Sequence, residues 1–241
     1  MTSRTIAIVD LGRTSYADCW DLQRRLSEER RVGSRGDVLL HTEHDHVYTL
    51  GKSANDDHLL ANDEELVRTG AEVFHIDRGG DITYHGPGQI VGYPILDLKD
   101  HREDLHWYLR SLEEVIILTL KRLGIEAGRE EGLTGVWVEG EKIAAIGVKV
   151  SRWITMHGFA LNVSTDLTRF ERIIPCGIFH KGVTSVDRIL GRPSDPAVIR
   201  RYLAESFSTM FGSDALWSTI ASVEPSGQPE TAISAYTSEK V

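Results

Sequence analysis

The chain is poor in cysteine and has no long apolar run. Only two cysteines, Cys19 and Cys176, occur among 241 residues, too few for the disulfide framework of a small secreted protein. No segment approaches the ~20 apolar residues that cross a bilayer, and the first residues lack the apolar stretch of a signal peptide. We therefore expect a soluble, cytoplasmic protein with no membrane partner.

An excess of basic charge is also missing. The formal net charge is -9, from 27 Lys and Arg against 36 Asp and Glu, and no long basic run is present. Because nucleic-acid-binding domains carry a concentrated basic surface, we expect no nucleic-acid partner. The 41% of hydrophobic and 26% of charged residues are ordinary for a globular protein.

Hydrophobic patterning predicts an α+β (mixed α/β) fold. Helices are expected where apolar residues recur every three or four positions, at residues 15–31, 103–123 and 197–211. Strands are expected at residues 4–10, 38–40, 47–50, 73–76, 90–95 and 158–163, with a hairpin formed by residues 136–138 and 142–150. We expect one domain over residues 1–215 and a loosely ordered tail over residues 216–241.

A glycine-rich segment, residues 78–89, lies between predicted strands and holds four glycines and one proline. Such a loop presents backbone N–H groups and lets a ligand approach closely, and Arg78 and His85 could add polar contacts. The segment lacks the Gly-Lys-Ser/Thr ending of a P-loop and does not open a clear helix as a dinucleotide fingerprint must. By composition alone, a ligand-binding loop and a plain hairpin loop are equally good interpretations.

Two other segments each carry one reactive side chain. Lys142 begins a strand in which Ala144, Ala145 and Gly147 leave room for a slender apolar chain beside the sheet. Cys176 stands between a proline and a glycine, a setting that can hold a thiol on an exposed bend. A surface lysine and a buried structural cysteine are the plainer interpretations, and they are the commoner ones for isolated residues.

Three histidines and two carboxylates crowd residues 41–46 and suggest a metal site. In an extended segment, however, His41 and His44 point to opposite faces. No second ligand cluster follows at the spacing of a metal site. We therefore expect no metal.

Taken together, these segments resemble the lipoyl(octanoyl) transferase family. The first block, RGGDITYHGPGQIVGY, is highly specific, and four blocks occur in the family's order: residues 78–93, Lys142 with residues 145–147, residues 157–162, and residues 175–177. Residues 43–49 fit the family's early segment, although Asp45 stands where the family often has proline. The similarity runs from about residue 5 to about residue 212.

The resemblance implies the fold shared by biotin protein ligases and lipoate ligases, so that residues 1–215 form the catalytic domain. It implies transfer of an octanoyl group from the phosphopantetheine of acyl carrier protein to a lysine ε-amine, with no other cofactor. The implied acceptors are the lipoyl domains of 2-oxoacid dehydrogenase E2 subunits and the glycine cleavage H protein.

By position, the resemblance makes Cys176 the thioester-forming nucleophile and Lys142 the residue that activates it. The substrate-binding positions that it implies are Arg78, Gly79, Gly80, Asp81, Ile82, Thr83, Tyr84, His85, Ala145, Ile146, Gly147, Gly158, Phe159 and Ala160.

The implied chemistry suits this pair of side chains. Only a few per cent of a thiol with a pKa near 8.5 is ionised at pH 7. A neighbouring ammonium stabilises the thiolate, and an amine whose pKa burial has lowered can accept the thiol proton. Each buried methylene contributes about 0.8 kcal/mol, which favours a C8 over a C6 tail by roughly fifteenfold. Longer tails must be rejected by a closed end of the pocket.

Three alternatives stay open at this point. An ATP-dependent lipoate or biotin ligase of the same fold would need no nucleophilic cysteine, and a non-catalytic module would only sequester acylated carrier protein. A thiol protease could draw on His157 and Asn162, but nothing resembles a protease cysteine helix.

Overall fold

The computed structural model describes residues 4–174 and 182–224. Along the chain its helices and strands are β1 (Arg4–Thr14), α1 (Tyr16–Arg31), β2 (Asp37–His44), β3 (Val47–Leu50), α2 (Asp63–Thr69), β4 (Glu72–His75), β5 (Ile82–His85), β6 (Gln89–Ile95), α3 (Leu105–Arg122), β7 (Gly128–Glu130), β8 (Leu133–Val138), β9 (Glu141–Ser151), β10 (Ile154–Asn162), α4 (Val186–Leu190), α5 (Pro196–Phe211) and β11 (Ser213–Ser218).

The described strands form a large mixed sheet and a small one. The large sheet has the order β11-β1-β2-β6-β10-β9-β8-β7, and the small sheet has the order β4-β3-β5. Within the large sheet, β1 pairs in parallel with β2 and β11, whereas β6, β10 and β9 pair antiparallel. The predicted mixed α/β fold is therefore confirmed.

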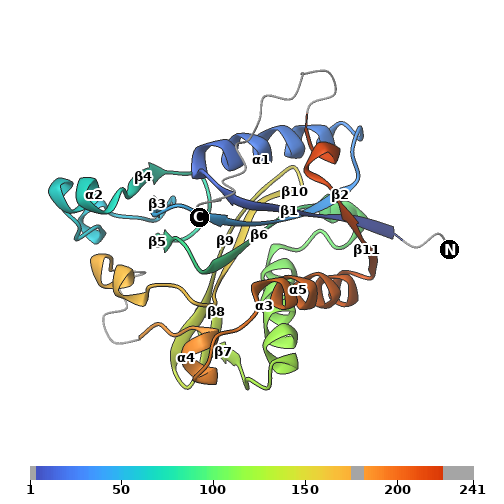
Figure 1. Cartoon of the computed structure of the whole chain (residues 1–241). Helices are drawn as coiled ribbons and strands as arrows, with labels where there is room; N and C mark the ends of the chain where they lie inside the picture. The colour runs from blue at the N-terminus through green and yellow to red at the C-terminus, as the bar shows by residue number, and fades with distance from the viewer. Residues whose placement is uncertain (1–3, 175–181, 225–241) are drawn as a thin grey trace, which may run out of the picture.

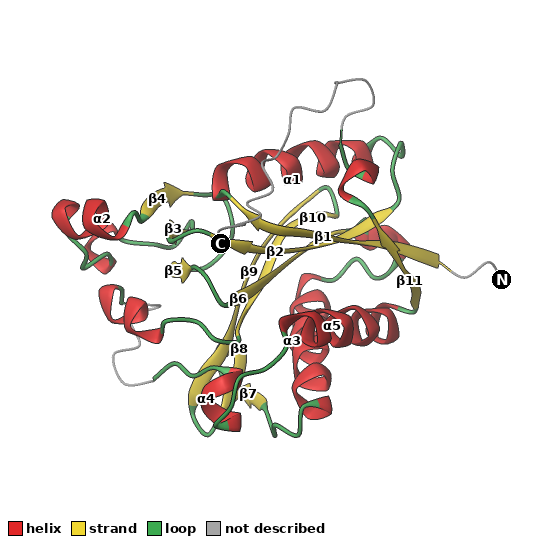
Figure 2. Cartoon of the chain, in the orientation of Figure 1, coloured by secondary structure: helices red, strands yellow, loops and turns green. Residues whose placement is uncertain are grey.

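Helices cover both faces of the large sheet (Figure 1; Figure 2). α3 and α5 bury Leu112, Ile116 and Phe207 in the larger core on one face. α1 buries Cys19 and Leu26 against the opposite face. Each such apolar side chain contributes about 1.5–3 kcal/mol when fully buried, and the two cores fix the strands between them.

Local signals explain where the main helices begin and end. The side chains of Ser15 and Asp104 accept hydrogen bonds from the first-turn N–H groups of α1 and α3. α3 ends just before Gly124, which has a φ of +78°, a value that favours glycine. No described helix has both the length and the apolar character needed to cross a bilayer.

The predicted helices and strands are confirmed to within a few residues at their ends, but several short elements were missed. These are α2, α4, β5, β7 and β11. β11 continues through Ser218, which lies beyond residue 215, and pairs with β1 over residues 213–218. The division into a domain and a tail stays a prediction, and residues 225–241 lie outside the described residues.

Candidate active site

A cavity of about 540 Å³ opens beside the edge of β9. β8 pairs with β9 only as far as Val136 and Ala144. Further along, the N–H of Gly79 donates to the Val148 carbonyl at 2.9 Å, so the 78–80 loop replaces β8 as the neighbour of β9. The cavity occupies the gap between these two contacts and has the size of an ordinary small-molecule pocket.

Small side chains form the floor of the cavity. Ala145 of β9 pairs with Ala160 of β10, and Ala160 pairs with Val91 of β6. Residues that lie directly opposite each other in a sheet share a face, and all three line the cavity. The room that we expected beside this strand is therefore present, and it suits an elongated apolar group.

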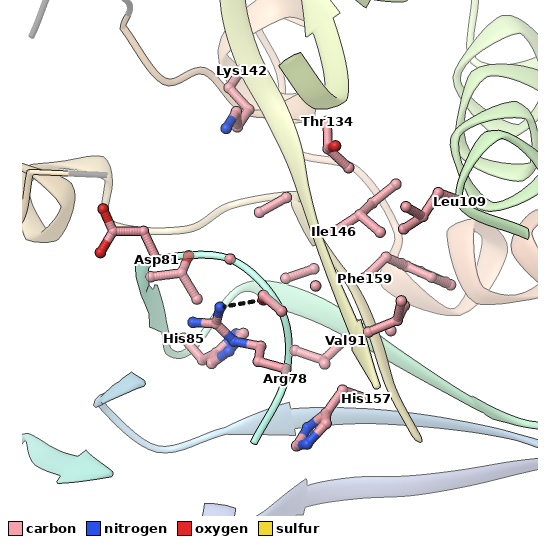
Figure 3. A pocket seen from close by; sticks show the side chains of 18 of the residues that line it. Arg78, Asp81, His85, Val91, Leu109, Thr134, Lys142, Ile146, His157 and Phe159 are labelled. Atoms are coloured by element: carbon pink, nitrogen blue, oxygen red, sulfur yellow. Dashed lines mark hydrogen bonds between the residues drawn. The ribbon is translucent and has the colours of Figure 1, made fainter. Parts of the chain in front are cut away.

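Lys142 lies at one end of the cavity, and His157 lies at the other (Figure 3). The Lys142 N–H donates to the Gly182 carbonyl at 2.9 Å, and its carbonyl accepts from the Thr184 N–H at 3.0 Å. Its ammonium nitrogen is 4.8 Å from the centre of the Trp137 ring, a cation–π contact. Gly182 directly follows residues 175–181, and Cys176, which is among them, lies outside the described residues.

A buried polar network holds residues 182–184 against Lys142. The Asn162 side chain donates to the Thr184 carbonyl at 3.1 Å and accepts from Gln89 at 2.9 Å. The Oε1 atom of Gln89 is 2.8 Å from Nδ1 of His85. This network connects the glycine-rich segment to the strand that carries Lys142.

Arg78 braces the glycine-rich segment. Its guanidinium donates to the carbonyl of Thr49 at 2.7 Å, to the Thr49 hydroxyl at 2.9 Å and to the Gly79 carbonyl at 3.1 Å. Because Thr49 belongs to β3 of the small sheet, these bonds fasten the loop that covers the cavity. Arg78 also lines the cavity, although it is only 7% exposed.

Gly147 allows this loop to approach β9. A Cβ atom on Gly147 would lie 2.9 Å from Cδ of Arg78 and 3.1 Å from the Gly79 carbonyl oxygen. Both distances are shorter than ordinary van der Waals contact. Any larger residue would push the loop away or fill the cavity.

We expect Gly147→Val to lower kcat/KM by roughly 100-fold, because a branched side chain occupies substrate space and displaces the Arg78 brace. Steady-state kinetics with an acyl-carrier donor measures this loss, and circular dichroism checks the fold. Gly36→Ala is the matched control, since a Cβ there meets nothing within 4 Å. Equal losses in both variants would contradict the close-approach argument.

The structure gathers the substrate-binding positions that the resemblance implies, with one exception. All of them line the cavity except Tyr84. The Tyr84 hydroxyl oxygen is 2.6 Å from Nδ1 of His46, and its ring meets Phe170 edge-on at 5.5 Å. Tyr84 therefore supports the small sheet and does not contact the cavity.

Ile146 of β9 and its partner Phe159 of β10 line the cavity on the side of the sheet that faces α3. Phe159 belongs to the larger core, and Ile146 and Leu109 pack against that core. Figure 3 shows Ile146 and Leu109 across the β9 ribbon from Arg78, Asp81 and His85. The cavity thus reaches around the open edge of the sheet.

His157 and Asn162 do not form the arrangement of a thiol protease. Nε2 of His157 is 2.9 Å from the Asp77 carboxylate, whereas Asn162 bonds to Gln89 and Thr184. Burial lowers the pKa of His157, although Asp77 opposes the shift. His157 lines the cavity, with its backbone held at a φ of +57°.

The histidines of residues 41–46 are dispersed. The ring of His41 lies 6.2 Å from Trp217, Nε2 of His44 is 2.8 Å from the Tyr93 hydroxyl oxygen, and His46 bonds to Tyr84. The three rings thus take part in separate aromatic contacts.

The sequence did not identify several residues that line the cavity. These come from the start of α1, from β6, from α3 and from the start of β8, and they include Tyr16, Val91, Tyr93, Leu105, Leu109 and Leu133. Val91 and Tyr93 belong to the specific block of residues 78–93, but no binding role was assigned to them. Tyr16, Leu105 and Leu109 showed only an apolar helical pattern, which is the same for residues that fill a core.

Comparison with known proteins agrees with this site. The family described as the lipoyl protein ligase A/B catalytic domain matches residues 15–208. The chain belongs to this family. Two curated relatives are named octanoyltransferase. The one from Cytophaga hutchinsonii is 46% identical, and the match covers 87% of this chain and 94% of the relative. The one from Rubrobacter xylanophilus is 54% identical, and the match covers 83% of this chain and 91% of the relative. The predictions of this family and of an acyltransferase are confirmed.

Solved structures of lipoate ligases share the fold of this family member. The bipartite lipoate protein ligase of Thermoplasma acidophilum superposes with a TM-score of 0.69 at 18% identity, covering 91% of this chain and 90% of that one. A lipoate-protein ligase A bound with ATP gives a TM-score of 0.67 at 17% identity, covering 92% of each chain. At such identities the likeness concerns the fold alone.

Proposed function

We propose that this enzyme transfers an octanoyl group from acyl carrier protein to a lysine of lipoyl domains, through a thioester on Cys176. The observation that carries the proposal is the cavity with an apolar floor that ends at Lys142. Gly182, whose carbonyl accepts the Lys142 N–H, directly follows the segment that contains Cys176. The relatives' name, octanoyltransferase, supports the acyl group.

The proposed reaction has two balanced steps. The Cys176 thiolate attacks the donor thioester carbonyl, and the phosphopantetheine thiol leaves with a proton supplied by Lys142. An acceptor lysine amine then attacks the enzyme thioester, and its proton passes through Lys142 to the departing Cys176 sulfur. The first step exchanges one thioester for another, whereas the second forms an amide and is downhill.

The acceptors in this proposal are the lipoyl domains of 2-oxoacid dehydrogenase E2 subunits and the glycine cleavage H protein, in the cytoplasm. The only prosthetic group involved is the phosphopantetheine that the donor carries. Lys142 serves as the acid and base, and backbone N–H groups near Gly147 or Gly177 are candidates to bind the oxyanion.

Intact-mass spectrometry after incubation with octanoyl carrier protein tests this function. We expect an adduct of octanoyl mass on the enzyme, mapped by peptide analysis to Cys176 and discharged by a lipoyl domain without ATP. Octanoylation of the lipoyl domain only in the presence of ATP would contradict the proposal and favour a ligase.

A further inference from the structure

Toward the His157 end of the cavity, away from Lys142, three aromatic side chains line it: Tyr16, His85 and Tyr93, which we call the end wall. The rings of Tyr16 and His85 stack with centroids 6.0 Å apart and an interplanar angle of 13°. His44 packs behind them, with its ring edge-on to Tyr16 at 5.3 Å and Nε2 at 2.8 Å from the Tyr93 hydroxyl oxygen. The wall comes from α1, β5 and β6, and His44 adds support from β2.

The end wall is uncharged at neutral pH. Burial lowers the pKa of His85 to about 3 and that of His44 to about 4. Burial raises the pKa of Tyr16 and of Tyr93 well above the ordinary value of a phenol. An apolar chain end can therefore touch this wall without removing a charge from water.

Strand register gives the distance from Lys142 to the wall. Gly92 and Ile146 both pair with Phe159, so the next residues, Tyr93 and Gly147, are level with each other. Gly147 is five residues beyond Lys142, but a bulge in β9 between Lys142 and Ala144 takes up as much as one residue of rise. The span is therefore about 14–17 Å at ~3.4 Å per residue. An extended lysine side chain takes up about 6 Å of it and leaves roughly 8–11 Å for a substrate.

This length matches an eight-carbon tail. The seven C–C bonds of an extended octanoyl group cover about 9 Å, and the eleven bonds of a dodecanoyl group cover about 14 Å. The floor between Lys142 and the wall is formed by Ala145, Ala160 and Val91, all apolar. A C8 tail fits this space, and a C12 tail is too long by a few ångströms.

We propose that the end wall sets the longest acyl chain that the enzyme accepts, with Tyr16 and Tyr93 meeting the terminal methyl of an octanoyl tail. This inference rests on the proposed function and adds residues that determine its specificity. The end wall accounts for the rejection of long acyl chains. Short chains are used less well because each lost methylene contact lowers the binding constant by about fourfold.

A competition assay tests the end wall. Wild-type enzyme receives an equimolar mixture of C6, C8, C10 and C12 acyl carrier proteins with excess lipoyl domain, and intact mass gives the ratio of the acylated products. Because all donors compete for the same enzyme molecules, the ratio does not depend on how much of a variant is folded. We expect C8 to dominate in the wild type.

Two variants move the preference in opposite directions. Tyr16→Leu shortens the wall and should raise the C12:C8 ratio at least tenfold. Ala145→Leu fills the floor and should raise the C6:C8 ratio at least tenfold. Tyr108→Leu is the matched control, because this fully buried tyrosine of α3 does not line the cavity, and it should leave both ratios within twofold.

The outcomes separate this inference from the proposed function. If the wild type transfers octanoyl but Tyr16→Leu keeps the wild-type C12:C8 ratio, the end wall does not measure the chain. An unchanged C6:C8 ratio in Ala145→Leu would contradict the proposed position of the acyl tail along β9. Failure of the wild type to transfer octanoyl from any carrier would instead reject the proposed function.

Discussion

Cys176→Ala is expected to lower the rate of octanoyl transfer by roughly 10³-fold or more, since it removes the proposed nucleophile. The enzyme adduct of octanoyl mass should disappear at the same time. Single-turnover transfer to a lipoyl domain measures the rate, and intact mass measures the adduct. Retention of a tenth of the wild-type rate would point to direct attack of the acceptor lysine on the donor thioester.

Cys19→Ala is the matched control for this variant. Cys19 is 2% exposed in the core beneath α1, and burial raises the pKa of its thiol to about 12. Almost none of it is thiolate at pH 7, so it cannot serve as the acyl carrier. We expect Cys19→Ala to keep the adduct and the rate per folded molecule, with some loss of stability from the small cavity.

Lys142→Met is expected to lower the transfer rate by roughly 10²- to 10⁴-fold, the usual worth of a positioned acid–base group. Methionine keeps the length of the side chain and removes its charge and its proton chemistry. The pH midpoint for alkylation of Cys176 by iodoacetamide should rise in this variant, because the thiolate loses its neighbouring cation. A purely structural role of Lys142 would leave that midpoint unchanged.

Lys149→Met separates a local effect from a general loss of charge. Lys149 lies on the same strand and pairs with Asp77, but it does not line the cavity. We expect the transfer rate of Lys149→Met to stay within about threefold of the wild-type rate. The pH midpoint for alkylation of Cys176 should shift by at most a few tenths of a unit. If both lysine variants lose activity alike, Lys142 has no special part in the reaction.

The sequence predicted the main elements because their signals are local. The apolar steps of α3 and the glycine after it need no knowledge of the rest of the chain. The short side chains of Ala145 and Gly147 likewise indicated space beside β9, and the cavity lies there. The residues of β11, SDALWS, carry no such pattern, and they form a strand because β1 offers an open parallel edge.

The details of the site depend on contacts between distant parts of the chain. Arg78 bonds to Thr49, which is 29 positions earlier, and no spacing rule connects the two. Tyr16 looked like one more core residue of α1, yet it lines the cavity because His85 and Tyr93 are brought beside it. Tyr84 packs in the core of the small sheet and bonds to His46, contacts that depend on the pairing of β5 with β3.

The opening of the cavity where β8 leaves β9 also constrains how the hairpin between them can change in length. Side chains of a strand alternate between faces, and a bulge between Lys142 and Ala144 already fits one extra residue into β9. One further residue between Lys142 and Ala145 would turn either Lys142 or the small side chains of the floor to the opposite face. The hydrogen bonds of Lys142 to residues 182 and 184 hold one part of the strand, and the bond from Gly79 to Val148 holds the other. Family members should therefore tolerate insertions at the turn before Glu141 far better than insertions within residues 142–148.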